Sequence, residues 1–178
     1  MYDVVIIGGG PAGYVSAIRC SQLGLSVACV ESMQDENGIQ KYGGTCLNVG
    51  CIPSKALLES SQRFYDVNNK LDKHGIKASN VELDIPAMMN RKDKIVSQLV
   101  GGVSGLFKAN KVTPIQGHGK LLSGMKVEVT NGESIEILEA KNIILASGSA
   151  PIEISAATFD GLNIVDSTGA LEFNSVPK

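Results

Sequence analysis

Residues 2–31 of the chain read YDVVIIGGGPAGYVSAIRCSQLGLSVACVE. Tyr2–Ile7 is a run of mostly apolar, β-branched residues, which is typical of a buried parallel strand. After the glycines, the spacing predicts a helix over residues 14–23, ended by Gly24. A second buried strand is expected over residues 25–30. The stretch therefore predicts a strand, loop, helix and strand in the order of a nucleotide-binding unit.

The loop between the first strand and the helix carries the pattern G-x-G-x-x-G at Gly8, Gly10 and Gly13. The first glycine permits a tight turn, the second lets backbone approach a pyrophosphate, and the third lets the helix lie close to the strand. Glu31 ends the second strand, where a carboxylate can accept hydrogen bonds from ribose hydroxyls. A carboxylate would repel a 2′-phosphate, but the loop alone does not separate FAD from NAD. The alternative is a glycine turn that only connects two packed elements.

Residues 43–55 read GGTCLNVGCIPSK, with Cys46 and Cys51 five positions apart. In a regular helix, Cα atoms at this spacing are on the order of 8–9 Å apart, and a disulfide needs about 7 Å or less. The pair can close only if the turn departs from an ideal helix, and Gly50 supplies that freedom. Such a bridge is easily reduced, which suits a redox disulfide. A helix beginning here would favour a thiolate at its N-terminus.

Two other interpretations of the cysteine pair remain open: two buried thiols, or half of a zinc site. Zinc is disfavoured because no second cysteine pair follows and His74 and His118 are the only histidines, so we expect no metal. Cys20 and Cys29 have apolar neighbours, and we interpret both as small core residues.

The remaining pattern predicts more helices and then strands. Residues 32–42 are polar and irregular, which indicates a surface loop. Helices are expected over residues 54–71 and 85–108, the latter with Ile95, Leu99, Val103 and Phe107 on one face. Gly101, Gly102 and Gly105 would mark close packing against another backbone. Strands are expected over residues 112–116, 119–122, 126–130, 134–138 and 142–146, with a hairpin at Asn131-Gly132.

Length and composition limit the class of protein. The 178 residues carry a net charge of −2, with 43% hydrophobic and 19% charged residues. No basic patch favours nucleic acid as a partner, and no apolar run is long enough for a membrane span. Four cysteines are too few for a secreted disulfide scaffold. The composition therefore indicates a globular protein of a reducing compartment, the cytoplasm.

The segment Gly43–Lys55, with Ala56-Leu57-Leu58 after it, resembles the redox motif of the dihydrolipoamide dehydrogenase family of flavin-disulfide enzymes. The resemblance extends through Gly8–Gly13, residues 117–120 and residues 144–149, and covers essentially the whole chain. Glutathione and mercuric reductases are similar but typically carry Val at positions 47 and 52. The resemblance implies an α/β fold: a Rossmann-like parallel sheet with helices on both faces, plus a small antiparallel β-meander.

The resemblance also implies that FAD is the cofactor and NAD the co-substrate. It implies that Cys51 faces the flavin as the charge-transfer thiolate, that Cys46 exchanges with the lipoyl substrate, and that Lys55 lies beside the reactive flavin nitrogen. Gly8–Gly13 would hold the pyrophosphate, Glu31 the ribose and Gly119 the adenine region. The implied cofactor-binding residues are Gly8, Gly10, Pro11, Ala12, Gly13, Glu31, Ser32, Gly44, Thr45, Cys46, Lys55, Gly119, Ser147, Gly148 and Ser149.

Family members are implied to act as homodimers on the lipoyl domain of a 2-oxo acid dehydrogenase complex. On this basis residues 1–150 form the FAD-binding domain with the redox disulfide. Residues 151–178 form a partial segment that leads toward an NAD-binding domain missing from this chain. The family's catalytic His–Glu pair has no match, so we expect the chain alone not to complete the NAD-linked reaction. The alternatives are another flavin-disulfide reductase and a non-catalytic flavin-binding module.

Overall fold

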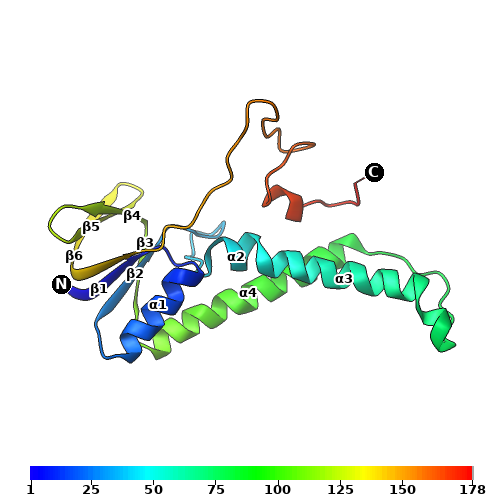
Figure 1. The fold of residues 1–178 in the computed structure, drawn as a ribbon, viewed down its shortest axis with the longest axis horizontal. Helices are drawn as coiled ribbons and strands as arrows, with labels where there is room; N and C mark the ends of the chain where they lie inside the picture. Colours follow the sequence, from blue (N-terminus) through cyan, green and yellow to red (C-terminus); the bar gives the residue numbers. More distant parts are fainter. Residues whose placement is uncertain (178) are drawn as a thin grey trace. The chain divides into compact units, whose positions relative to one another are not determined.

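The computed structural model describes residues 1–177 and divides into two compact units (Figure 1). The first unit comprises Met1–Asn48 and Gln98–Ala150. The second comprises Val49–Ser97 and the chain after Ala150. The chain passes from one unit to the other within α2 (Gly44–Val49) after Asn48, within α4 (Ile85–Ala109) after Ser97, and again after Ala150.

A mixed sheet forms the first unit, and within the described residues its order is β3-β2-β1-β6-β5-β4. The strands are β1 (Tyr2–Ile7), β2 (Val27–Glu31), β3 (Thr113–Gln116), β4 (His118–Leu122), β5 (Lys126–Asn131) and β6 (Ser134–Leu145). β1 is parallel to β2 and β6, and β2 is parallel to β3. β4, β5 and β6 form an antiparallel meander. The expected fold class, a parallel α/β sheet with a small meander, is confirmed.

Strand β6 differs from the prediction of two separate strands over residues 134–138 and 142–146. It is continuous: its first half pairs with β5, and its second half, from Ala140 to Leu145, pairs with β1. The charged residues Glu139 and Lys141 lie between the two predicted strands. In the structure they are the exposed positions that alternate with buried Leu138 and Ala140, so the period of two continues through them.

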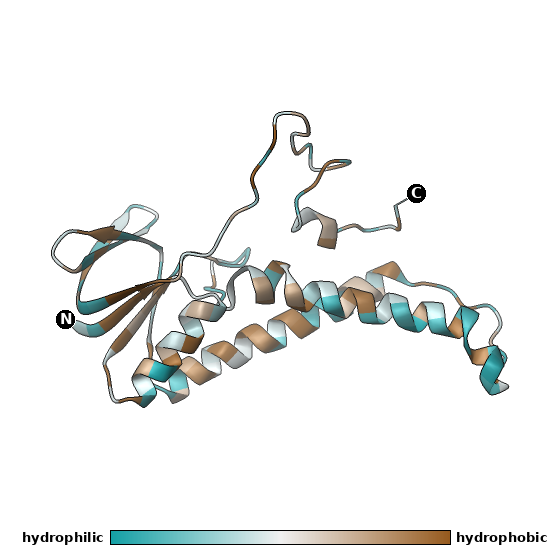
Figure 2. Cartoon of the chain, viewed as in Figure 1, coloured by the Kyte–Doolittle hydropathy of each residue, from teal (hydrophilic) through white to brown (hydrophobic). Residues whose placement is uncertain are grey.

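The core of the first unit lies between the parallel sheet and the meander. Its members come from four strands: Val5, Ile7, Ala28, Val30, Val127, Val129, Leu138 and Ala140. The residues that alternate with them in β1 and β2, such as Val4 and Ile6, are equally buried. Helix α1 (Pro11–Gln22) contacts β1 and β2 and buries Gly13 and Ala17. Figure 2 shows β1 and β2 as largely hydrophobic.

Helix α1 begins three residues earlier than predicted, at Pro11. Proline is favoured at the first helical position because its missing N–H is not needed there, so the sequence did contain this start signal. The predicted end is confirmed, since Gly24 has a φ of +84° just after the helix. The hairpin at Asn131-Gly132 is also confirmed by the pairing of Asn131 with Ser134.

The second unit contains α3 (Cys51–Asn69), the short helices η1 (Leu71–His74) and η2 (Gly169–Leu171), and the first half of α4. Arg91 of α4 joins α3 through the Ala56 carbonyl at 3.0 Å and the Glu59 carboxylate at 2.8 Å. Lys92 is 2% exposed and joins the tail through the Glu172 carboxylate at 2.8 Å and the Leu171 carbonyl at 3.1 Å.

Two predictions for α4 are wrong. Gly101, Gly102 and Gly105 are exposed, and a Cβ placed on any of them would meet nothing within 4 Å, so they mark no close backbone contact. Leu99 is 42% exposed, although Val103 and Phe107 of the predicted face are buried.

Candidate functional site

The glycine loop joins β1 to α1 and packs tightly on itself. A Cβ at Gly13 would lie 1.8 Å from the Gly8 carbonyl oxygen, and one at Gly8 would lie 2.1 Å from the Ala146 carbonyl oxygen. No side chain larger than hydrogen fits at either position, since real Cβ contacts are longer than about 3 Å. The close approach predicted for Gly13 is therefore present, and the start of α1 rests directly against the end of β1.

The N-terminus of α1 is suited to an anion. Gly10 precedes the helix without a side-chain cap, and no acidic residue lies in the first turn. Pro11 and Ala12 are exposed, so the first-turn backbone is accessible from solvent. Unpaired N–H groups and the helix dipole favour negative charge at such a position. These residues fit the pyrophosphate of a dinucleotide.

Glu31 is held at the carboxyl end of β2 by two backbone groups. The N–H of Gly9 donates to its Oε2 and the N–H of Met33 donates to its Oε1, both at 2.8 Å. The Glu31 carboxylate is half-buried, and the neighbouring Ser32 is exposed. Because each carboxylate oxygen can accept a further hydrogen bond, the carboxylate keeps capacity for ribose hydroxyls while it fixes the glycine loop.

The segment after β6 lies next to the same loop. The Ala146 N–H donates to the Ile7 carbonyl at 2.8 Å, and the Ser147 nitrogen lies 3.3 Å from the Cβ position of Gly8. Ser147, Gly148 and Ser149 follow as exposed residues. The structure thus brings Ser147 beside Gly8, as a cofactor role for both would require. The more distant Gly119 lies over Ile7 and Val30, where a Cβ would come within 3.0 and 3.2 Å of their side chains.

The first cysteine lies in α2 (Gly44–Val49). Gly44, at the start of this helix, lies against the glycine loop, because its Cβ would be 2.7 Å from the Gly10 Cα. Thr45 is exposed and Cys46 is half-buried. Gly50 separates α2 from α3 with φ −145° and ψ −111°. The predicted departure from a regular helix at Gly50 is confirmed.

The second cysteine begins α3. Cys51 and Lys55 are both exposed, and Lys55 is four positions after Cys51, so the two lie one turn apart on the same face of the helix. The Ser54 hydroxyl donates to the Cys51 carbonyl at 3.1 Å. An anion at Cys51 would have the α3 N-terminus beneath it and a lysine one turn away.

The remaining cysteines and the histidines lie elsewhere. Cys29 is fully buried in β2, and burial raises the pKa of its thiol to about 12, with a further contribution from the negative charge of Glu31. It is a core residue, as predicted. Cys20 is half-buried in α1, and His74 and His118 are exposed.

Sequence reasoning missed three buried polar side chains. Asn48 is 7% exposed and Lys92 is 2% exposed. Tyr42 is 3% exposed, and its ring centroid lies 4.5 Å from that of Phe107. Asn48 lies in the cysteine motif between Cys46 and Cys51, and nothing in the sequence indicated that its side chain is buried. Lys92 lies three positions before Ile95 and seven before Leu99 of the predicted apolar face, but a charged side chain is usually exposed, so its burial was not predicted.

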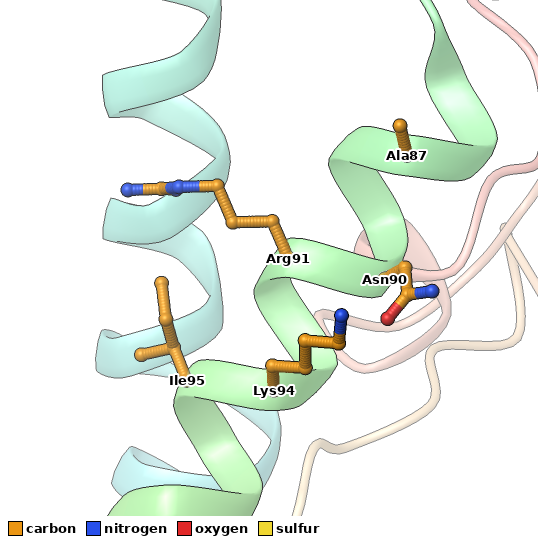
Figure 3. A pocket seen from close by; sticks show the side chains of 5 residues that line it. All are labelled: Ala87, Asn90, Arg91, Lys94 and Ile95. Carbon is orange, nitrogen blue, oxygen red and sulfur yellow. The ribbon is translucent and has the colours of Figure 1, made fainter.

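A pocket on α4 is lined by none of the predicted site residues. Ala87, Asn90, Arg91, Lys94 and Ile95 line it. Figure 3 shows Arg91 reaching toward α3, whereas Asn90 and Lys94 extend to the other side of the helix. The Arg91 guanidinium is already paired with the Glu59 carboxylate, so it is not available to bind an anion in this pocket. In the described part of the chain, no helix has the length and hydropathy needed to cross a membrane.

Comparison with known proteins identifies similar sequences and folds. A family model described as pyridine nucleotide-disulphide oxidoreductase matches residues 2–178. The mitochondrial dihydrolipoyl dehydrogenase of Pisum sativum is 49% identical over 178 residues, covering 99% of this chain and 34% of the relative. Leghemoglobin reductase of Glycine max is also 49% identical, with 99% and 33% covered. The chain therefore spans about a third of the length of these relatives.

Solved structures show the same fold. LpdA from Mycobacterium tuberculosis superposes with a TM-score of 0.85 at 21% identity, over 98% of this chain and 38% of that protein. RclA from Escherichia coli, a flavoprotein disulfide reductase, gives 0.75 at 26% identity, over 99% and 35%.

Proposed function

Because the chain belongs to the pyridine nucleotide-disulphide oxidoreductase family, we propose that it binds FAD and carries the redox-active Cys46–Cys51 pair of a dihydrolipoamide dehydrogenase. One observation carries the proposal: a glycine loop at the N-terminus of α1 contacts Gly44, where the cysteine motif begins. The 49% identity to a dihydrolipoyl dehydrogenase supports the choice of activity. In this proposal residues 1–150 form the FAD-binding domain, and residues 151–178 lead toward an NAD-binding domain.

The nucleotide part of FAD would be held by the first unit. The backbone of Gly8, Gly10, Pro11, Ala12 and Gly13 would bind the pyrophosphate at the α1 N-terminus. Glu31, with Ser32 beside it, would accept hydrogen bonds from the ribose. Gly119 would contact the adenine region through its backbone, and Ser147–Ser149 would cover the cofactor.

The flavin end would be served by residues 44–55. Gly44, Thr45 and Cys46 would line the flavin, and the Lys55 ammonium would stabilise negative charge on the ring. When bound, the flavin supplies two-electron transfer between the cysteine pair and a nicotinamide. The chain contributes the sulfurs, their position and the charges around them.

The sulfur chemistry follows thiol–disulfide exchange. One thiolate of a dihydrolipoyl group attacks the Cys46 sulfur, the Cys46–Cys51 bond breaks, and Cys51 leaves as a thiolate. The second lipoyl thiol, after losing its proton, displaces Cys46, so the lipoyl group leaves as a disulfide and both cysteines are reduced. The reduced cysteine pair would then hold the two electrons that a bound flavin could accept. The helix N-terminus and Lys55 would stabilise the Cys51 anion.

We extend the proposal to the whole protein by analogy with its longer relatives. Its partner would be the lipoyl domain of a 2-oxo acid dehydrogenase complex, and it would act as a homodimer. The compartment would be the cytoplasm or, in a eukaryote, the mitochondrial matrix, as the name of the Pisum sativum relative indicates for that protein.

The test is spectroscopic. The purified chain, mixed with FAD, should retain one flavin per chain and show a long-wavelength thiolate-to-flavin band on mild reduction with dihydrolipoamide. Cys51→Ser should abolish the band, and Cys20→Ser, a half-buried cysteine on α1, should leave it intact. A bound flavin whose spectrum is the same in wild type and Cys51→Ser would favour the non-catalytic flavin-binding module instead.

A second candidate activity is supported by the equal identity to leghemoglobin reductase of Glycine max. Identity over this third of the relatives does not separate the two activities. A substrate assay on the entire protein, with dihydrolipoamide and ferric leghaemoglobin as alternatives, would separate them. A preference for glutathione disulfide or Hg²⁺ would contradict both.

A further inference from the structure

The cysteine helix and the glycine loop are joined by the turn Tyr42–Gly44. The Gly43 N–H donates to the Gly9 carbonyl at 2.8 Å. Gly44 has φ +56°, a conformation that favours glycine, and its Cβ position is 2.7 Å from the Gly10 Cα. Any movement of this turn would therefore move the phosphate-binding backbone and the start of α2 together.

Asn48 fastens this turn from inside. Its Nδ2 donates to the Tyr42 carbonyl at 3.1 Å and to the Gly44 carbonyl at 3.0 Å. Because both partners are carbonyl oxygens, which only accept, the amide orientation is determined by its contacts. The two bonds fix the residues on both sides of Gly43 in one geometry.

The other end of the Asn48 amide shows that packing alone does not explain this residue. Asn48 is more than nine-tenths buried, and among the described residues its Oδ1 has no hydrogen-bond donor. A buried acceptor without a donor is costly, and leucine fills a similar volume without that cost. The amide is therefore better explained by what its NH₂ group holds than by the space it fills.

Tyr42 makes the turn rigid at its first residue. Its hydroxyl donates to Gln40 Oε1 at 2.6 Å. Gln40 in turn donates through Nε2 to the Glu31 carbonyl at 3.1 Å and the Ile115 carbonyl at 2.7 Å. These hydrogen bonds hold Tyr42 against the ends of β2 and β3. The bond from Asn48 to the Tyr42 carbonyl then connects α2, which carries Cys46, to this part of the sheet.

We propose that Asn48 is a positioning residue for the flavin site: its amide holds the Tyr42–Gly44 turn so that α2, with Cys46, is fixed against the glycine loop. The inference rests on the proposed function, since it states that the hydrogen bonds of Asn48 support the binding of FAD. Asn48 touches neither the reacting atoms nor the nucleotide in this scheme and acts only through the turn.

The test compares Asn48→Leu with wild type in the 178-residue chain. Leucine removes the unpartnered acceptor but also leaves the Tyr42 carbonyl without the Asn48 donor, so the two effects oppose each other and the melting temperature should change little. The FAD dissociation constant should nevertheless increase by about tenfold or more, as expected for the loss of two neutral hydrogen bonds. Asn48→Ser, whose hydroxyl can still reach the carbonyl four residues back, should give an intermediate value.

Asn68→Leu is the matched control. Asn68 makes the same kind of bond to a carbonyl four residues earlier, from Nδ2 to Phe64 at 2.8 Å, on the exposed surface of α3. This variant should bind FAD like wild type. If Asn48→Leu binds FAD with unchanged affinity, or loses affinity only in proportion to lost stability, the inference is wrong.

A flavin-free measurement separates this inference from the proposed function. Amide hydrogen exchange at Gly43, whose N–H is bonded to Gly9, should accelerate about tenfold or more in Asn48→Leu but not in Asn68→Leu. If wild type binds no FAD but this acceleration is seen, the proposed function fails and the role of Asn48 in the turn stands. Unchanged Gly43 exchange would overturn the inference whatever the flavin does.

Discussion

The two units of the chain are stabilised by different interactions. Among the described residues, the second unit buries only Pro53, Ala56 and Val96 of its apolar side chains, whereas the other buried apolar residues lie in the first unit. The most buried large side chain of the second unit is the charged Lys92. Many of its apolar side chains, including Leu58 at 62% and Leu162 at 77%, are exposed.

This contrast indicates that the first unit is the more stable part of the chain and the second unit the more adaptable part. The first unit buries strands on both faces, so its geometry is fixed by close packing that tolerates little change. The second unit depends on polar contacts such as Arg91 with Glu59 and Lys92 with Glu172, which contribute less per contact. Figure 2 shows the same contrast in hydropathy between β1 and the far half of α3. We therefore expect the second unit to open locally at lower free energy.

The largest effect should come from the core of the first unit. Ile6 is fully buried, so Ile6→Ala should lower the free energy of unfolding by about 2–5 kcal/mol through lost burial and a cavity. Urea unfolding followed by circular dichroism measures it. The control is Leu58→Ala in the second unit, at a residue 62% exposed, which should change stability by about 0.5 kcal/mol or less. Similar effects at both sites would contradict the contrast between units.

Cys29 adds a pH dependence to the first unit. Burial raises the pKa of its thiol from 9.0 to about 12, so the folded state keeps the proton that the unfolded state loses. The stabilisation is complete below pH 9 and is lost as the pH rises toward 12, with a slope of at most about 1.4 kcal/mol per pH unit. Cys29→Ala should lack this contribution to the alkaline slope, and Cys20→Ala should keep it. Equal slopes in all three proteins would show that Cys29 is not the group responsible.

The strand, glycine loop, helix and second strand at the start of the chain could be predicted from sequence because local and tertiary preferences agree there. The run Tyr2–Ile7, the glycine spacing and Gly24 each specify one structure. The joining of two predicted strands into β6 was not foreseen, because the prediction treated the two apolar runs as separate strands. The segment between them has no turn residue, and the alternation of Leu138 and Ala140 with the exposed Glu139 and Lys141 continues one strand through it.

The site was predicted in its residue types but not in its supporting contacts. The glycine loop, Glu31 and the helix break at Gly50 follow from motif and spacing. The clamp made by Asn48 depends on two carbonyl groups that a sequence does not display, and the burial of Lys92 depends on a tail 80 residues away. Hydrogen bonds and ion pairs between residues far apart in the chain follow no periodic spacing, so no sequence pattern predicts them.

In the second unit, the contact between Lys92 and Glu172 should control the tail. Glu172→Gln weakens a charge-assisted bond whose carboxylate is 60% exposed, so the expected cost is about 1 kcal/mol. Amide exchange around η2, for example at Ala170, should become several-fold faster while exchange in β1 stays unchanged. The control is Asp93→Asn, which alters the other carboxylate near Lys92, at 3.2 Å, but does not join α4 to the tail. Faster exchange in β1 as well would mean that the two units open together.

The smallest effect should come from the surface of the first unit, at Asp3. The Lys141 ammonium at 2.7 Å and then the Ser26 hydroxyl and N–H hold the pKa of its carboxyl well below the usual range. Its stabilisation is therefore present above about pH 4 and is lost as the pH falls below that. Asp3→Asn should lower the melting temperature slightly at pH 6, and the difference from wild type should shrink toward pH 2. Glu36→Gln, on the exposed loop, controls for the loss of one charge. A difference that persists undiminished at pH 2 would mean that Asp3 acts through its shape and hydrogen bonds, so that even the surface of this unit depends on packing more than on charge.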